Sequence, residues 1–133
     1  MVLAYKDIGK INLDVHNRFE YTLDNKDKDD WRSHAKVFLA DPKYVIKDDC
    51  DGLAATVAEL LIMKGAKKVW RIMCSMQGGS AIDHMVTMVE DVTGQRWIVG
   101  DTASTLPKRL QFYDGRIFLF NNVNEGLGWN PHP

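Results

Sequence analysis

The spacing of apolar positions predicts one long helix near the middle of the chain. From Asp51 to Lys64, leucine and valine recur at steps of three and four residues, and several alanines add helix propensity. Gly65 follows directly and is a natural C-terminal stop for a helix. Because apolar residues fill most of this segment, we expect the helix to be largely buried.

Beyond the helix, β-branched and aromatic residues predict strands at four places: Lys68–Ser75, His84–Glu90, Arg96–Val99 and Arg116–Phe120. The second and third are joined by Asp91–Gln95, which contains the glycine that a short hairpin needs. Loops are predicted at Gln77–Ser80, which contains Gly78 and Gly79, and an Asp114-Gly115 turn precedes the fourth strand.

The pattern before the central helix is less regular. Ile11–Leu23 fits either a short helix or an extended segment, and the polar run Asp24–Asp30 predicts a loop. Trp31–Leu39 predicts a helix that ends before Pro42, because the residue preceding a proline disfavours the helical conformation. Helices first and an antiparallel sheet second are the layout of an α+β fold.

Composition narrows the class of protein. A length of 133 residues suits a single domain, residues 1–133, and 45% apolar with 26% charged residues is typical of a globular chain. A net charge of -1 gives no general attraction to nucleic acid. Met1–Lys10 lacks the apolar core of a secretory signal, and no apolar run is long enough to cross a membrane. We expect a cytoplasmic protein, encoded by a host or a phage, with no nucleic-acid or membrane partner.

The two cysteines have different settings, so no disulfide is expected between them. Cys74 lies in an apolar run and is assigned to the core, whereas Cys50 lies in a polar, acidic one. Three histidines, His16, His34 and His132, are expected to be surface or cap residues, because none has a zinc-motif spacing with either cysteine.

Cys50 is the first sign of chemistry. It stands in the run Asp48-Asp49-Cys50-Asp51 at the head of the central helix, where the helix dipole and unpaired amides favour a thiolate. The neighbouring aspartates oppose this effect, because like charge disfavours the thiolate. A positive charge must offset them, either His84 as an imidazolium or a bound cation such as calcium on Asp48, Asp49 and Asp51.

His84 and Asp101 complete the set. His84 opens one strand and Asp101 follows the end of the next, so a hairpin would bring them to the same edge. Cys, His and Asp are the minimum equipment for a thiolate nucleophile, its base and the group that orients the base. Each also has an ordinary explanation: a small core thiol, a hydrogen-bonded edge histidine, and a turn or cap aspartate.

These motifs resemble those of the bacterial transglutaminase-like cysteine proteinases, members of the papain-like and transglutaminase-like superfamily. In that family an acidic-Cys-acidic motif opens the core helix, as at Asp49-Cys50-Asp51. A His-Met-Val motif opens a strand, as at His84, and an aspartate ends the next strand, as at Asp101. The resemblance implies a papain-like fold in which the nucleophile helix packs on an antiparallel sheet.

The resemblance also implies roles. Cys50 would be the nucleophile, His84 the general base and then acid, and Asp101 the orienter. The Cys50 amide and a second donor, Asn17 or Trp31, would hold the oxyanion.

Family members that cleave adhesins use calcium bound by acidic residues around the cysteine, a role that falls here to Asp49 and Asp51. The chain departs from the family at four positions. Asp48 stands where a glycine is usual, Gly52 and Leu53 stand where an acidic residue and a tyrosine are usual, and Thr102 stands where an asparagine often follows the aspartate.

The expected function is hydrolysis of a peptide or side-chain amide through a thioester acyl-enzyme, with a protein or peptide as substrate and no cofactor in the chemistry itself. Two alternatives stay open. The same triad serves transglutaminase transfer to an amine, and the same fold can serve as a partner-binding module without turnover.

Overall fold

The computed structural model describes residues 3–22, 32–75, 84–113, 116–122 and 130–131. Predictions that fall on the loops at Asp24–Asp30 and Gln77–Ser80, on Trp31, on the 114–115 turn and on His132 lie outside this part of the chain. Within it the protein combines helices with an antiparallel sheet, as predicted for an α+β fold.

A five-stranded antiparallel sheet forms one layer. Its strand order is β7-β6-β5-β4-β8. The strands span Val69–Ser75 (β4), His84–Glu90 (β5), Arg96–Val99 (β6), Lys108–Arg109 (β7) and Arg116–Asn122 (β8). The sequence predicted all of these except β7, a pair of charged residues without strand character, which precedes a 3-10 turn at Leu110–Phe112.

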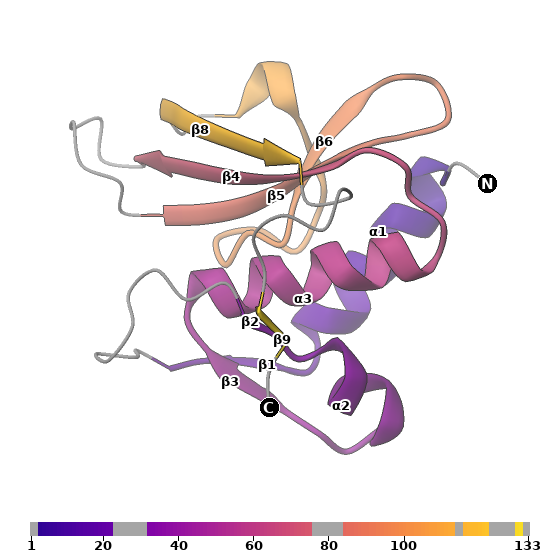
Figure 1. Cartoon of the computed structure of the whole chain (residues 1–133), viewed down its shortest axis with the longest axis vertical. Helices are drawn as coiled ribbons and strands as arrows, with labels where there is room; N and C mark the ends of the chain where they lie inside the picture. The colour runs from indigo at the N-terminus through magenta and orange to yellow at the C-terminus, as the bar shows by residue number, and fades with distance from the viewer. Residues whose placement is uncertain (1–2, 23–31, 76–83, 114–115, 123–129, 132–133) are drawn as a thin grey trace.

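Helix α3 (Cys50–Met63) packs against this sheet and is the centre of the fold (Figure 1). Its side chains share one core with alternate residues of β5, such as Met85 and Val89. The intervening residues of β5, Val86 and Met88, pack with Cys74 on the other face of the sheet. Cys74 is thus a core residue, and the period of two along β5 follows from strand geometry.

In the N-terminal part, one helix runs alongside α3 and the other short elements lie across α3 from the sheet (Figure 1). This part consists of α1 (Tyr5–His16), β1 (Phe19–Tyr21), α2 (Ala35–Ala40) and β3 (Ile46–Asp48), where β1 pairs with β3 in parallel. A second short parallel pair joins β2 (Arg32–Ser33) to β9 (Asn130–Pro131).

Two N-terminal predictions are correct only in part. The segment from Ile11 to Leu23 is predicted to be a short helix or extended, and it contains both, because α1 ends at His16 and β1 follows at Phe19–Tyr21. The helix predicted from Trp31 begins only at Ala35, since Arg32 and Ser33 pair with β9 instead. Local propensity cannot register such a pairing with a strand far along the chain. The predicted end before Pro42 is correct, because α2 stops at Ala40.

No helix in the described part of the chain is both long and apolar enough to span a membrane.

Candidate active site

Cys50 is the first residue of α3. The chain reaches it from β3, which is held beside β1 by pairs that include Tyr21 with Asp48. Asp49 has an extended backbone and serves as the N-cap, so the helical conformation begins at Cys50. The thiol is half-buried, and the amides of the first helical turn have no partner within a helix. Cys50 therefore lies at a position that favours negative charge.

The β5–β6 hairpin brings His84 and Asp101 together. Its turn is organised by Asp91, whose Oδ1 accepts the Thr93 and Gln95 amides while Oδ2 accepts the Trp97 indole N–H at 2.8 Å. His84 begins β5 and Asp101 lies two residues past β6, so both reach the same end of the hairpin. There the Nε2 of His84 lies 2.8 Å from the Oδ1 of Asp101.

Two contacts fix this hairpin on α3. The hydroxyl of Thr87 donates to the carbonyl oxygen of Ala54 at 2.7 Å. Gly100, at a φ of 60°, comes so close to the helix that a Cβ there would lie 3.0 Å from the Cα of Ala54. Only glycine suits both the close approach and the positive φ. As a result, the first turn of α3 and the start of β5 lie at the same end of the molecule (Figure 1).

The thiol of Cys50 lies near enough to the His84 side chain to raise its pKa. Because Nε2 of His84 bonds to Asp101, Nδ1 is the ring nitrogen left for the thiol. Burial alone would lower the pKa of His84, but its hydrogen bonds to Asp101 and Cys50 and their charges raise it to about 9. Burial would raise the pKa of Asp101, whereas the hydrogen bonds from His84 and the Ala103 amide bring it below its usual value. At neutral pH this pair is an imidazolium and a carboxylate.

An acidic cluster, defined as Asp48, Asp49 and Asp51, lies beside Cys50. One carboxylate oxygen from each lies within 4.8 Å of the others. Asp49 and Asp51 are buried, at 8% and 3% exposure. The Oδ1 of Asp49 and the Oδ2 of Asp51 have no hydrogen-bond partner among the described residues. Burying unpaired carboxylate oxygens is costly unless a cation or a proton compensates them.

Asp49 and Asp51 also act on each other. Burial, the hydrogen bond to Asp49 and the charges of Asp49, Asp48 and Cys50 raise the pKa of Asp51 far above its usual range. Burial and the charge of Asp48 raise the pKa of Asp49 in the same direction. Without a cation, this pair of carboxyls therefore retains a proton at neutral pH, which reduces the negative charge next to the thiol.

Asp48 has a different environment, because it is paired with His34. The Nε2 of His34 lies 2.8 Å from the Oδ2 of Asp48, and its Nδ1 lies 2.8 Å from the Tyr44 hydroxyl. Burial would raise the pKa of Asp48, but the His34 hydrogen bond and charge and the Asp49 amide lower it overall. His34 is the N-cap residue of α2, as one of the two predicted roles has it, but it is only 2% exposed and is not a surface residue.

Gly52 makes room for the Asp48 carboxylate. A Cβ at position 52 would lie 2.0 Å from the Oδ2 of Asp48, closer than any two such atoms can come. Two of the departures from the motif, Asp48 and Gly52, are therefore linked: the carboxylate of residue 48 fills the space that a side chain at position 52 would need. The sequence alone did not suggest this link, because the two positions look independent along the chain.

Neither predicted oxyanion donor has a described hydrogen bond with Cys50. Asn17 is exposed at the end of α1, where its amide bonds to the carbonyl of Leu13, and no described hydrogen bond links it to Cys50. Trp31 lies outside the described residues. The sequence did not suggest Tyr21, which does lie near the thiol: burial and the charges of Cys50, Asp49 and Asp51 all raise its pKa. Its place opposite Asp48 in the β1–β3 pair explains this proximity.

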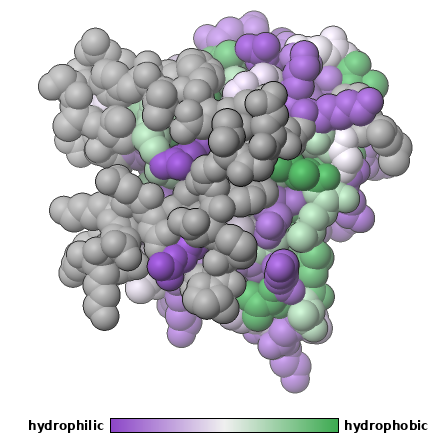
Figure 2. Space-filling view, in the orientation of Figure 1, coloured by the Kyte–Doolittle hydropathy of each residue, from purple (hydrophilic) through white to green (hydrophobic). Residues whose placement is uncertain are grey.

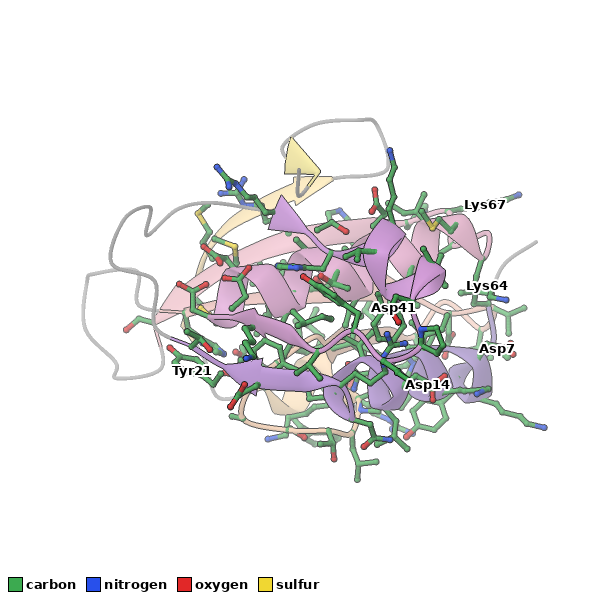
Figure 3. All side chains as sticks on the ribbon, turned by 90° about the horizontal axis from the view of Figure 1, so that it is seen from below. Asp7, Asp14, Tyr21, Asp41, Lys64 and Lys67 are labelled. Atoms are coloured by element: carbon green, nitrogen blue, oxygen red, sulfur yellow. The ribbon has the colours of Figure 1, made fainter. Side chains whose placement is uncertain are left out.

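A separate apolar groove of about 740 Å³ lies elsewhere, between α1, α2 and the C-terminal end of α3. Exposed apolar residues appear on that side of the molecule in Figure 2. Figure 3 shows Asp7 and Lys64, which line the groove, at the opposite end of the molecule from Tyr21. The groove therefore forms no part of the Cys50 site.

Comparison with models of known protein families finds none that matches this chain, and comparison with curated proteins finds no match.

Proposed function

We propose that the protein is a cysteine hydrolase, a peptidase or amidase, that cleaves amide bonds through Cys50, His84 and Asp101. One observation carries the proposal: the Nε2 of His84 lies 2.8 Å from the Asp101 carboxylate, and the same ring is near enough to the Cys50 thiol for that thiol to raise its pKa. This is the order of contacts that a thiol nucleophile, its base and an orienting group require.

The chemistry follows from these contacts. His84, as an imidazolium, holds the proton that Cys50 has given up, and the Cys50 thiolate attacks the amide carbonyl carbon. The oxyanion that forms is stabilised by the Cys50 amide at the positive end of α3. His84 then gives its proton to the leaving amine, which leaves a thioester on Cys50. Water, deprotonated by His84, hydrolyses the thioester and restores the thiol.

The fold supports the same assignment at a coarser level. A helix with the nucleophile at its N-terminus packs on an antiparallel sheet whose β5–β6 hairpin carries the base and the orienter. This is the arrangement expected of a papain-like or transglutaminase-like domain, and we propose that the chain has that fold. The substrate would be a protein or peptide that reaches the half-buried thiol.

Calcium fits the acidic cluster in part. Calcium prefers carboxylate oxygens, and the Oδ1 of Asp49 and the Oδ2 of Asp51 are buried without partners among the described residues. Asp49 and Asp51 would hold the ion. Asp48 is already bonded to His34. As a third ligand, it would bind the ion and His34 with the same carboxylate. A bound cation would offset the negative charge next to Cys50.

The thiol can be tested directly with iodoacetamide, because Cys74 in the same chain is a buried control. We expect Cys50 to be alkylated at neutral pH much faster than Cys74, and His84→Ala to slow Cys50 by about 100-fold, the range for loss of a positioned base. His34→Ala is the matched control, since it breaks the other histidine–aspartate pair. Equal, slow rates at both cysteines would overturn the hydrolase and favour a partner-binding module on this fold.

The metal can be tested by melting the protein with a chelator and with added calcium. Binding to the folded state stabilises the protein and so raises its melting temperature. The gain in free energy of unfolding is about 2.7 kcal/mol when the free calcium concentration is one hundred times the dissociation constant. Asp51→Asn should remove the calcium-dependent shift, whereas Asp14→Asn, at an exposed residue paired with Lys10, should retain it. Superimposable melts of the unaltered protein would retire the calcium proposal and leave the triad untouched.

A further inference from the structure

Helix α1 meets the segment that carries Asp101 through two residues one helical turn apart, Asn12 and His16. Residues with this spacing project from the same side of a helix. Asn12 is fully buried, although its side chain is a polar amide. Buried polar side chains are retained where hydrogen bonds satisfy them, so the partners of Asn12 show what this part of α1 does.

Asn12 bonds on both sides of Asp101. Its Oδ1 accepts the Gly100 amide at 2.8 Å, and its Nδ2 donates to the carbonyl oxygen of Thr105 at 2.9 Å. An amide side chain can accept and donate at once, which suits it to hold two points of a loop. The segment 100–105 is thereby attached to α1 at both ends.

His16 holds the residue between these points. Its Nε2 lies 2.9 Å from the backbone carbonyl oxygen of Asp101, and its Nδ1 lies 2.6 Å from that of Asn12. A carbonyl oxygen can only accept, so each ring nitrogen that bonds must donate. The backbone of Asp101 is thus bonded to α1, while its carboxylate is bonded to His84.

We infer that His16 is a positioning residue of the candidate site: it holds the backbone of Asp101 so that the Asp101 carboxylate meets the Nε2 of His84. The inference deepens the proposed function and rests on the proposed role of Asp101 as orienter. His16 itself does not touch the thiol or the reacting atoms.

Two substitutions separate the two ring contacts. Glutamine places its amide nitrogen near the position of Nε2, and asparagine places its amide nitrogen near that of Nδ1. His16→Gln therefore keeps a donor for Asp101, whereas His16→Asn loses it and keeps only the contact within α1. If His16 served only to stabilise α1, His16→Asn would be the milder of the two substitutions, or the two would have equal effects.

The readout is the titration of the His84 ring followed by nitrogen-15 NMR in a Cys50→Ala background, which makes the result independent of thiol chemistry. We expect His16→Gln to leave the His84 pKa close to that of the Cys50→Ala parent, and His16→Asn to lower it by about one unit, because the Asp101 carboxylate is then less firmly placed. Melting curves of each variant show that it is folded.

Equal His84 titrations in the parent and in both variants would overturn the inference. If His16→Asn does not fold, Asn12→Ser takes its place, since it removes both anchors that flank Asp101 and should lower the His84 pKa in the same way. Failure of the proposed function is seen separately, as slow alkylation of Cys50 in the unaltered protein.

Discussion

Two histidine–aspartate pairs of the same length lie in the described part of the chain, and they differ in the group that the second ring nitrogen faces. Both Nε2–Oδ distances are 2.8 Å. In the pair of His84 and Asp101 the ring also contacts the thiol of Cys50. In the pair of His34 and Asp48 it contacts the hydroxyl of Tyr44. A histidine bonded to a carboxylate is thus no signature of catalysis, and the third partner decides between chemistry and structure.

Burial sharpens the contrast. The His34 side chain is 3% exposed and its backbone amide donates to Thr56 of α3, whereas the His84 side chain is 11% exposed beside a half-buried thiol. The structural pair should therefore affect stability most, and the candidate catalytic pair should affect reactivity most. Four experiments test this division, from the largest expected effect to the smallest.

His34→Ala should lower the free energy of unfolding by about 3 kcal/mol, because it leaves the Asp48 carboxylate without its principal partner. Urea unfolding of the variant and the unaltered protein measures the difference. The double variant with Asp48→Asn should recover part of the loss, since no unpaired charge remains. A loss of thiol reactivity without loss of stability would reverse the assignment of the two pairs.

Raising the pH should weaken the fold through His84. Its pKa is raised from 6.5 to about 9, so the contribution to stability is complete below about pH 6.5 and is lost as the pH rises through about 9. The loss amounts to at most about 3 kcal/mol. Unfolding measured between these pH values shows the slope. His84→Gln should flatten it, and persistence of the full slope in that variant would assign it to another group.

Gly52→Ala should destabilise the protein by about 2 kcal/mol through overpacking. The sign is informative, because alanine normally stabilises a helix relative to glycine. The cause is the Asp48 carboxylate, 2.0 Å from the added Cβ. In an Asp48→Gly background the same substitution should be neutral or stabilising. Additive effects of the two changes in a double-mutant cycle would contradict the proposed link.

Tyr44→Phe should have the smallest effect, about 1 kcal/mol, because it removes one hydrogen bond from His34 and no packing. Alkylation of Cys50 should not change. A change in the alkylation rate of Cys50 in this variant would show that the two pairs are connected, contrary to the division drawn above.

The sequence predicted the parts of this molecule that depend on local pattern. The central helix, β5 and β6 have nearly the predicted bounds, because their apolar spacing and hairpin turn are local features. The meeting of His84 with Asp101 followed from the same hairpin. The short strands β1, β3 and β7 were missed, since two or three residues contain too little pattern to register.

The supporting residues could not be found in this way. His34, Asn12 and His16 act on residues 14 to 93 positions away in the chain, and their partners are often backbone atoms, which carry no sequence signal. Gly52 looked like a departure from a motif, and only its approach to the Asp48 carboxylate explains it. Such contacts appear once the elements are packed.

The hydrogen bond from Thr87 to Ala54 fixes the position of α3 along β5. Ala54 lies one turn beyond Cys50 and Thr87 lies three residues beyond His84, so this bond sets the thiol-to-imidazole spacing from within the core. A helix that slid by one residue would move the sulfur by about 1.5 Å. The connection after α3 at the exposed Lys67 is not needed to keep that spacing. It is therefore a place where an inserted peptide or tag should leave the thiol and the imidazole in register.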